Sequence, residues 1–241
     1  MIKLNKLSII IPVFNEESTI FDLLKKVNEI ELINGIEKEI IIVNDASNDS
    51  SFDRINSFLK QFNNPNIISI THQINQGKGA GIHTGLKVST GDWIVIQDAD
   101  LELEPNDLNK LIEPIINDGT EVVYGSRYLD KTNQAGDGFL ARQANAFLTW
   151  LSNVVFGIKI TDMETCYKMV RGDLFKGLIL KEKRFGFEPE ITAKLAKIKS
   201  VRFKEVPITY NARLSNEGKK IGWKDGVRAV YCIIKYGWFS K

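Results

Sequence analysis

The sequence predicts an α/β fold, a mainly parallel, twisted sheet with helices on both faces. Short runs rich in β-branched residues alternate with helical patterns from the N-terminus to about residue 125. Composition agrees, because 241 residues that are 43% hydrophobic and 26% charged can bury a large core and are not typical of disordered or fibrous chains. Parallel strands need crossover helices, and these cover both faces of the sheet.

The predicted strands are nearly continuous apolar runs, as in strands that are buried on both faces. They cover residues 7–14, 39–43, 66–71, 93–97 and 121–124. Between them, apolar residues at helical spacing predict helices at 18–30, 50–62, 79–88 and 106–117. Later in the chain, helices are predicted at 139–156, 184–197 and 225–238, and a strand at 201–206. The helix at 139–156 is predicted to have one apolar face, formed by Leu140, Ala144, Phe147, Leu148, Leu151 and Val155.

The chain contains no internal repeat and no low-complexity linker. One domain is therefore expected over residues 1–210. Residues 211–241 are expected to form a basic loop and a C-terminal amphipathic helix that pack on the same domain.

The net charge of +2 is unevenly distributed, because residues 199–241 hold ten Lys and Arg against three Asp and Glu. Such a basic tail favours an anionic partner, either phosphate groups or a membrane surface, and no nucleic-acid recognition motif accompanies it. The two cysteines lack ligand spacing, which argues against disulfide scaffolds and zinc sites. No apolar run of about 18 residues and no signal-peptide cleavage region is found, so a cytoplasmic protein is expected.

Polar side chains follow four of the predicted strands at the point where each strand ends. Asn15 and Glu16 follow the first strand, Asp45 the second, Lys78 the third, and Asp98 and Asp100 the fourth. Ligands of parallel sheets bind at the carboxyl ends of the strands, where the connecting loops gather. The four loops are therefore expected to build one site.

The Asp98-Ala99-Asp100 triplet, with Glu102 two residues later, is predicted to bind Mg²⁺ or Mn²⁺. Alternate carboxylates at a strand end can converge on one hard cation, whose shell is completed by diphosphate oxygens. The cation would neutralise charge on a departing nucleotide. The alternative is a polar loop without such a role. Asp45 is predicted to accept hydrogen bonds from a ribose or a base, whereas Asp49 is expected to cap the following helix.

The glycine-rich segment at residues 77–81 matches neither the dinucleotide fingerprint nor the GK[ST] phosphate-binding loop. Its expected use is a close approach between two backbones, with Lys78 near phosphate groups. His72 and His83 lack the spacing of metal ligands, so structural or surface roles are expected for both.

Five motifs taken together resemble the family 2 glycosyltransferases. They are Pro12-x-x-Asn15-Glu16, Asn44-Asp45-Ala46-Ser47-x-Asp49, Asn75-x-Gly77-x-Gly79, Asp98-Ala99-Asp100 and Gly125-Ser126-Arg127-Tyr128. Within that family the pattern is most similar to the polyprenyl-phosphate sugar synthases of the dolichyl-phosphate mannose synthase type, over about residues 7–238. The resemblance implies a GT-A fold, a nucleoside-diphosphate-sugar donor and inversion at the anomeric carbon.

The resemblance also implies roles for individual residues. The base and ribose would be held by Pro12, Phe14, Glu16, Val43 and Asp45. The diphosphate and its metal would be surrounded by Asp98, Ala99, Asp100 and Glu102, where relatives often have Gln in place of Glu102. Arg213 and Lys219 match a basic loop that closes over the diphosphate. Arg127 and Arg142 would receive the acceptor phosphate, although many relatives have Ser where Ala141 precedes Arg142.

The implied acceptor is a polyprenyl phosphate, dolichyl or undecaprenyl, that receives mannose or glucose. A phosphate is already anionic at neutral pH, so it needs arginines for orientation and no general base. Two alternatives stay open. One is transfer to a sugar hydroxyl with Glu188 or Glu190 as base, although both could simply favour the start of a helix. The other is a noncatalytic sugar-nucleotide-binding subunit, against which the intact motifs argue.

The predicted helix at 225–238 has an apolar stripe bordered by Lys224, Arg228 and Lys235. Such a helix can lie on a membrane surface, although packing against the core explains the stripe equally well. Membrane contact is expected to be peripheral on the cytoplasmic face, or to run through a membrane-anchored partner protein. The donor stays open between GDP-mannose, UDP-glucose and others.

Overall fold

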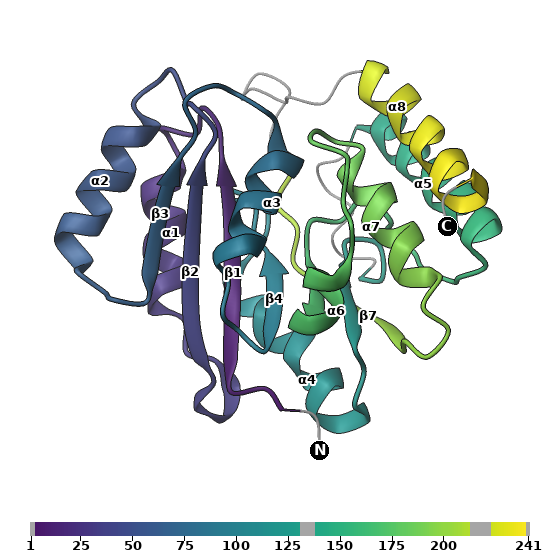
Figure 1. The fold of residues 1–241 in the computed structure, drawn as a ribbon, viewed down its shortest axis with the longest axis horizontal. Helices are drawn as coiled ribbons and strands as arrows, with labels where there is room; N and C mark the ends of the chain where they lie inside the picture. The colour runs from purple at the N-terminus through teal and green to yellow at the C-terminus, as the bar shows by residue number, and fades with distance from the viewer. Residues whose placement is uncertain (1–2, 131–137, 213–222, 240–241) are drawn as a thin grey trace.

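A computed structural model describes residues 3–130, 138–212 and 223–239. Its centre is a seven-stranded sheet with strand order β3-β2-β1-β4-β6-β5-β7 (Figure 1). The strands are β1 (Lys6–Val13), β2 (Glu37–Asn44), β3 (Ile67–Thr71), β4 (Trp93–Ile96), β5 (Val122–Ser126), β6 (Lys168–Arg171) and β7 (Phe203–Pro207). Only β6 runs antiparallel to its two neighbours in this sheet, which confirms the prediction of a mainly parallel sheet.

Helices cover both faces of the sheet, as predicted. In Figure 1, α3 lies in front of the strands and α1 behind them. α3 packs on β1 and β2, whereas α4 packs on β5 and β7. The helices are α1 (Ile20–Glu29), α2 (Ser51–Phe62), α3 (Lys78–Val88), α4 (Leu108–Asp118), α5 (Phe139–Phe156), α6 (Gly172–Gly177), α7 (Phe187–Ala196) and α8 (Trp223–Ile234). Short 3₁₀ turns at Ile33–Gly35 and Pro105–Asp107 and a π-helical turn at Lys235–Phe239 complete the description.

The central strands have no exposed face. Successive side chains of a strand point to opposite faces, yet Ile9, Ile10 and Ile11 of β1 are all fully buried. β3 differs, because it forms the edge of the sheet and its side chains are half-buried or exposed. The expectation that this strand is buried on both faces was therefore wrong.

Two elements were not predicted, the strand β6 and the short helix α6 that follows it. β6 has only four residues, too few to show a period, and its first residue is a fully buried lysine, Lys168. Because β6 runs antiparallel between β4 and β5, its amino end lies at their carboxyl ends. The residues just before β6 are thus placed beside the loops that were predicted to build the site.

α5 turns a more polar side towards the protein than its pattern predicts. Asn145, Thr149 and Ser152 are buried with Leu148, whereas the side chain of Leu140 is 82% exposed. Two polar side chains of α5 bind the backbone at residues 160–163. They are those of Thr149, whose Oγ1 accepts from the Met163 amide at 3.1 Å, and of Asn153, which exchanges two bonds with the backbone of Ile160. The predicted apolar face is therefore only partly correct.

α8 packs against α5 and α7 and is held by one buried carboxylate. Glu182, 6% exposed, accepts from Arg228 Nη2 and from the Tyr236 hydroxyl, each at 2.7 Å, and pairs with Lys235 at 3.3 Å. In the part of the chain that the structure describes, no helix is both long and apolar enough to cross a bilayer.

Candidate active site

The loops that follow β1, β2 and β4 meet at the carboxyl edge of the sheet, as predicted. The Asn15 amide donates to Ser47 Oγ at 3.0 Å, and the Asn48 amide donates to Asn15 Oδ1 at 2.9 Å. Thr19 Oγ1 then joins the β4 loop by donating to the carbonyl oxygen of Ala99 at 3.1 Å. Asp49 accepts from the amide of Ser51, the first residue of α2, at 2.9 Å, so it satisfies an amide at the start of this helix, although the N-cap position itself is Ser50.

The residues predicted to hold the base and ribose lie together at the ends of β1 and β2. Pro12 and Val43 face each other in register and are buried. Phe14 follows β1 and is partly buried. Glu16 is fixed by its amide, which donates to Ser51 Oγ at 2.7 Å, and by its carboxylate, which accepts from Thr19 Oγ1 at 3.1 Å.

Asp45 organises the loop that precedes α3. Its carboxylate, 3% exposed, accepts from the amides of Gln76 at 3.0 Å and Gly77 at 2.6 Å and lies 2.7 Å from His72 Nδ1. The other nitrogen of His72 bonds Thr84 Oγ1 at 2.8 Å, so this histidine has the structural role that was expected. Binding of a ribose by Asp45 stays a prediction, because in this structure both carboxylate oxygens hold the loop.

The glycine-rich segment makes the close backbone approach that was predicted. Gly77 has φ of +103°, and a Cβ added there would lie 2.5 Å from the carbonyl oxygen of Lys183. A Cβ on Gly79 would lie 2.4 Å from the carbonyl oxygen of Glu182. Side chains are excluded at both positions, since no real Cβ approaches a carbonyl oxygen so closely. This contact sets Lys78 at the start of α3.

Lys78 joins the β4 loop to α7 through a chain of charges. Its Nζ lies 2.7 Å from Asp98 Oδ1 and 3.4 Å from Glu188 Oε1. Glu188 is also paired with the fully buried Lys168 of β6. Burial alone would lower the pKa of Lys78, but Asp98 and other nearby groups, including Glu188, raise that pKa well above its usual value. Lys78 is therefore a cation held against the carboxylate that was predicted to bind a metal.

Asp98, Asp100 and Glu102 are not gathered into one three-carboxylate group. Among the residues described, no three His, Cys, Asp or Glu side chains lie close enough together to hold a metal ion. The reason lies in the backbone after Asp100, where the amide of Glu102 donates to Asp100 Oδ1 at 3.2 Å. The Glu102 carbonyl oxygen and Leu103 are tied to Asn211 and Tyr210. The prediction of Glu102 as a third ligand beside the two aspartates therefore lacks structural support.

The two remaining carboxylates still fit a divalent cation. Asp98 and Asp100 lie two residues apart at the sheet edge, and Asp98 already binds a positive charge, that of Lys78. Mg²⁺ in nucleotide sites is commonly held by one or two carboxylates, with the other ligands supplied by phosphate oxygens and water. A metal that arrives with a diphosphate thus suits this donor set better than a metal held by protein alone.

Arg127, at the end of β5, is fixed by a buried partner. Its Nε and Nη2 donate to the two oxygens of Asp162 at 2.7 and 2.8 Å, and the Asp162 side chain is fully buried. The rings of Tyr128 and Tyr210 lie 5.5 and 5.3 Å from the guanidinium carbon. These contacts set the plane of the guanidinium and, among the described residues, leave the N–H groups of Nη1 for a further partner.

Of the other basic residues predicted to bind phosphate groups, only Arg142 lies among the described residues. Arg142 is partly buried in the first turns of α5. Asn145, three residues along the same helix, donates to Asp162 at 3.4 Å, so Arg142 lies about one helical turn from the Arg127–Asp162 pair. Arg213 and Lys219 lie outside the described residues.

The structure gives Glu188 and Glu190 structural contacts in the first turn of α7. Glu190 is fully buried and accepts from the amides of Lys181 and Glu182 and from Lys194 Nζ. Glu188 binds Lys168 and Lys78, as described above. Both carboxylates therefore hold the loop at 181–183 or the nearby lysines in place.

Several residues of this site were missed in the sequence. Asp162 orients Arg127, Lys168 binds Glu188, and Glu164 lies among them. Lys168 gave one signal, since a lysine in the apolar run Cys166-Tyr167-Lys168-Met169-Val170 needs a buried anion. Asp162 and Glu164 carry no such signal.

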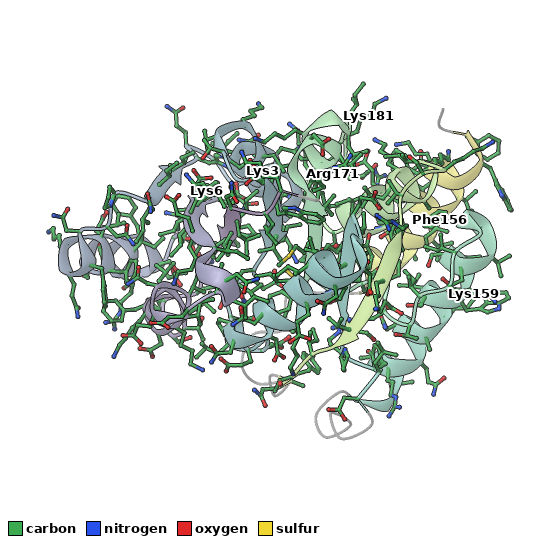
Figure 2. The ribbon with its side chains drawn as sticks, turned by 90° about the horizontal axis from the view of Figure 1, so that it is seen from below. Lys3, Lys6, Phe156, Lys159, Arg171 and Lys181 are labelled. Carbon is green, nitrogen blue, oxygen red and sulfur yellow. The ribbon has the colours of Figure 1, made fainter. Side chains whose placement is uncertain are left out.

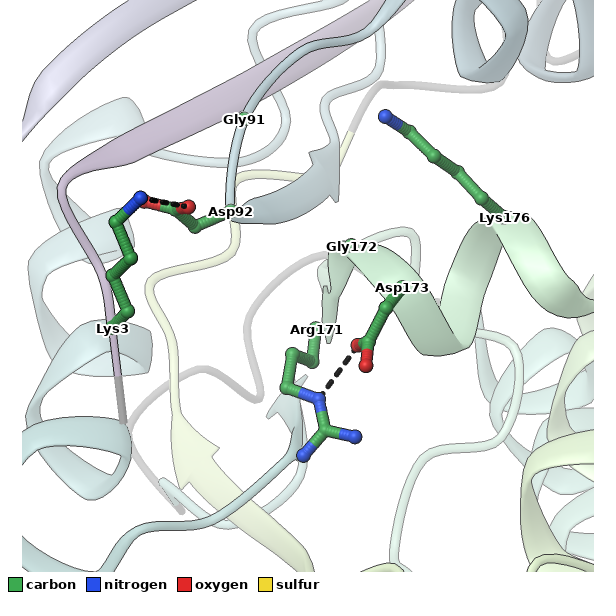
Figure 3. Close-up of a pocket in the computed structure, with 7 residues that line it drawn as sticks. All are labelled: Lys3, Gly91, Asp92, Arg171, Gly172, Asp173 and Lys176. Atoms are coloured by element: carbon green, nitrogen blue, oxygen red, sulfur yellow. Dashed lines mark hydrogen bonds and ion pairs between the residues drawn. The ribbon is translucent and has the colours of Figure 1, made fainter. Parts of the chain in front are cut away.

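A hollow of about 560 Å³ lies at the opposite edge of the sheet, next to the amino end of β4. Figure 2 views the molecule from this side, and Figure 3 shows the lining residues: Lys3, Gly91, Asp92, Arg171, Gly172, Asp173 and Lys176. Its carboxylates already have partners, because Asp92 pairs with Lys3 at 3.5 Å and Asp173 with Arg171 at 2.6 Å. The hollow lies away from the loops that carry the motifs.

Solved structures share the fold. One of them is glucosyl-3-phosphoglycerate synthase from Mycobacterium tuberculosis, in complex with Mn²⁺, UDP and phosphoglyceric acid. The match has a TM-score of 0.71 and covers 97% of this chain and 79% of the synthase chain. The two sequences are 16% identical, so this likeness establishes the GT-A fold alone.

Curated relatives match almost the whole chain. A dolichol-phosphate mannosyltransferase from Pyrococcus furiosus is 26% identical over 236 residues, which are 96% of this chain and 64% of that protein. A prophage bactoprenol glucosyl transferase homolog from Escherichia coli is 27% identical over 234 residues, 97% of this chain and 73% of that protein.

The family itself is established by a family model. The model for glycosyl transferase family 2 matches residues 8–178, which include the loops after β1, β2 and β4, the glycine-rich segment and Arg127. This range covers most of the chain, and it confirms the family that the five motifs predicted. The chain belongs to glycosyl transferase family 2.

Proposed function

We propose that this protein is an inverting, metal-dependent transferase that moves one hexose from a nucleoside-diphosphate sugar to a polyprenyl phosphate. The proposal is supported mainly by two groups of charged side chains that lie at the carboxyl ends of the strands. Lys78 and the Asp98–Asp100 carboxylates lie at the end of β4, and the Arg127–Asp162 pair lies at the end of β5, two strands away. A donor diphosphate at the first position and an acceptor phosphate at the second would hold the sugar between them.

On the donor side, Lys78 is the residue placed to bind phosphate. When a diphosphate with Mg²⁺ or Mn²⁺ is bound, the cation would neutralise the charge that develops on the leaving nucleotide. Lys78 would then exchange Asp98 for a phosphate oxygen while keeping its contact with Glu188. Pro12, Phe14, Glu16, Val43 and Asp45 would line the base and ribose. Ala99 would lie against the diphosphate, and Arg213 and Lys219 would close over it.

On the acceptor side, Arg127 would present its Nη1 edge to a phosphate oxygen, assisted by Arg142. The oxygen is anionic before it attacks, so no proton has to be removed. The attack forms a bond from this oxygen to the anomeric carbon as the bond to the nucleotide diphosphate breaks, which inverts the carbon. Arg127 is already oriented by Asp162 and two tyrosine rings, and such preorganisation lowers the cost of aligning the reactants.

Transfer to a sugar hydroxyl is the weaker candidate. It needs a carboxylate that can take a proton from the acceptor, and Glu188 and Glu190 were the residues considered. Glu190 is enclosed by two backbone amides and Lys194, and Glu188 is bound by two lysines, which argues against either as the general base.

A membrane-facing surface would bring the enzyme to its lipid acceptor. α5 and α8 pack together and expose large apolar side chains, namely Leu140, Phe147, Trp150 and Val154 of α5 and Val227, Tyr231 and Trp238 at α8 and the turn after it. Arg228 and Lys235 lie on α8 and the following turn, and both are partly exposed. Apolar and aromatic residues beside cations suit the surface of an anionic bilayer. We therefore propose peripheral attachment through this α5–α8 surface, on the cytoplasmic face.

Charged residues in the α5–α8 surface should weaken membrane attachment. The double variant Trp150→Glu and Trp238→Glu is expected to bind vesicles of anionic phospholipid at least about tenfold more weakly, because two indole rings lose their apolar contact. Co-sedimentation with the vesicles measures this. Ile116→Glu, an exposed apolar position on α4, is the control and should bind as the wild type does. Equal binding by all three proteins would contradict the proposed surface.

The donor can be identified by a thermal-shift screen. UDP-, GDP- and dTDP-sugars are tested with Mn²⁺ and again with a chelator. Because a ligand that binds only the folded state stabilises it by mass action, about 2.7 kcal/mol at a hundred times Kd, the true donor should raise Tm only when the metal is present. If no sugar nucleotide raises Tm with Mn²⁺, the proposed function is wrong.

A further inference from the structure

Four enclosed polar atoms near Arg127 and Glu188 have no hydrogen-bond partner in the described part of the chain. They are Asn145 Oδ1, Glu164 Oε1, Thr165 Oγ1 and Glu188 Oε1. The side chains of Asn145 and Glu188 are more than nine-tenths buried, and Thr165 is fully buried. A buried polar atom without a partner costs about 1–3 kcal/mol, so a group of them in one place calls for an explanation.

The contacts around these atoms place them in one region. Asn145 donates through Nδ2 to Asp162, the partner of Arg127. Lys168 Nζ donates to the Thr165 carbonyl oxygen and to Glu188. The Glu164 carboxylate is close enough to both pairs to interact electrostatically with Glu188, Lys168, Arg127 and Asp162. The region therefore lies between the proposed acceptor pair, Arg127–Asp162, and the proposed donor pair, Lys78–Asp98.

The chemistry of the atoms points to a particular kind of ligand. Three of the four are amide or carboxylate oxygens, which accept hydrogen bonds. A phosphate group offers oxygens as well and would be repelled by the two carboxylates. A sugar ring offers several hydroxyl donors at short spacing. Glu188 Oε1 has an ion pair with Lys78 at 3.4 Å but accepts no hydrogen bond from the described residues, so its capacity to accept one from a hydroxyl is unused.

We propose that Asn145, Glu164 and Glu188 form a subsite that accepts hydrogen bonds from the hydroxyl groups of a sugar ring held between Lys78 and Arg127. The inference rests on the proposed function, because it assigns a sugar ring to the space between the donor diphosphate and the acceptor phosphate. The ring is that of the transferred hexose or, in the alternative reaction, that of a sugar acceptor. Selection among hexoses would then depend on Glu164, which no motif of the sequence marks.

The electrostatics of Glu164 agree with a missing donor. Burial first, and then the charge of Glu188, raise the pKa of Glu164 to about 7. A carboxylate that received a hydroxyl hydrogen bond would be stabilised in its charged form. Lys168 and Arg127 offset only part of this rise in pKa, so the described residues stabilise the charged form of Glu164 incompletely.

The test compares a nucleoside diphosphate with its sugar conjugate. Calorimetry gives Kd for UDP and UDP-glucose, and for GDP and GDP-mannose, each with Mn²⁺, in wild type, Glu164→Met and Glu164→Gln. Met keeps the length of the side chain but removes the acceptors, whereas Gln keeps one. Glu113→Gln, an exposed position on α4, is the matched control.

We expect Glu164→Met to weaken binding of the sugar nucleotide at least about tenfold while the nucleoside diphosphate binds as in wild type. Glu164→Gln should lose less, and Glu113→Gln nothing. If the sugar nucleotide is unaffected but KM for a sugar acceptor rises by a similar factor, the subsite holds the acceptor ring. If neither changes, or if the nucleoside diphosphate is weakened equally, the subsite is overturned, although the proposed function would stand. If wild type binds no sugar nucleotide, both fail.

Sugar nucleotides that lack one hydroxyl group test the same point in the wild-type protein. For wild type, one deoxy analogue is expected to bind about tenfold more weakly than the parent compound. For Glu164→Met, the same analogue and the parent compound are expected to bind equally well. The measurement on wild type does not depend on the stability of a variant. Equal affinity of every deoxy analogue and the parent for wild type would overturn the proposal.

Discussion

The Asp100→Asn variant is expected to lose metal-dependent nucleotide binding and at least about a hundredfold of its transfer activity. Asp100 and Asp98 are the two carboxylates at the end of β4 that fit a divalent cation arriving with a diphosphate. Replacing one charged ligand by a neutral amide weakens the metal, and the departing nucleotide then carries its charge without compensation. The measurement is the rise in Tm caused by Mn²⁺ and nucleoside diphosphate, together with the transfer rate.

The control for this prediction is Asp92→Asn. Asp92 lies just before β4, at the opposite end of the same strand, where it accepts from the Asn5 amide at 2.9 Å and pairs with Lys3. Asparagine keeps an acceptor there, so this variant should respond to Mn²⁺ and nucleotide as wild type does. A full metal-dependent rise in Tm for Asp100→Asn would refute the assignment of Asp100.

The Arg127→Lys variant is expected to transfer sugar to a lipid phosphate about ten- to a hundredfold more slowly while binding the donor normally. Lysine keeps a positive charge beside Asp162, but it lacks the fork that grips Asp162 and a phosphate at once. The loss corresponds to one or more hydrogen bonds to a charged group. Steady-state rates with varied acceptor, and calorimetry with the donor, separate the two effects.

Arg127→Ala would test the stability of the fold as well as acceptor binding, so it is less suitable than Arg127→Lys. It leaves the fully buried Asp162 without its partner, which costs about 3–5 kcal/mol and endangers the fold. Arg171→Lys is the suitable control, because Arg171 is also paired with carboxylates but lies at the opposite edge of the sheet. If Arg127→Lys and Arg171→Lys transfer sugar equally well, the acceptor phosphate does not bind at Arg127.

Much of the fold could be predicted from sequence because its first half follows local rules. Each parallel strand there is an apolar run followed by a loop rich in Asn, Asp and Gly, so the edge that gathers the loops was evident. Asp98 and Lys78 could be placed at that edge on this basis alone, whereas Arg127 was indicated only by the family resemblance. The backbone path at Glu102 could not be predicted, because the ties of Glu102 and Leu103 to Asn211 and Tyr210 depend on a distant segment.

The middle of the site could not be predicted, because it depends on the antiparallel return of β6. This strand is four residues long, and its pairing with β4 and β5 brings Asp162, Glu164 and Lys168 beside Arg127 and Glu188. None of these residues stands at a recognisable motif spacing from its partners. Similarly, the side of α5 that packs inwards was predicted only in part, because Thr149 and Asn153 bind the backbone before β6 and so draw polar side chains towards the core.

The most direct test is anomalous diffraction from a crystal grown with Mn²⁺ and the nucleoside diphosphate that the screen selects. The account predicts one manganese peak in contact with the carboxylates of Asp98 and Asp100 and with the diphosphate, with Lys78 turned from Asp98 to a phosphate oxygen. A nucleotide bound without manganese at the two aspartates, or with Lys78 still paired to Asp98, would contradict it.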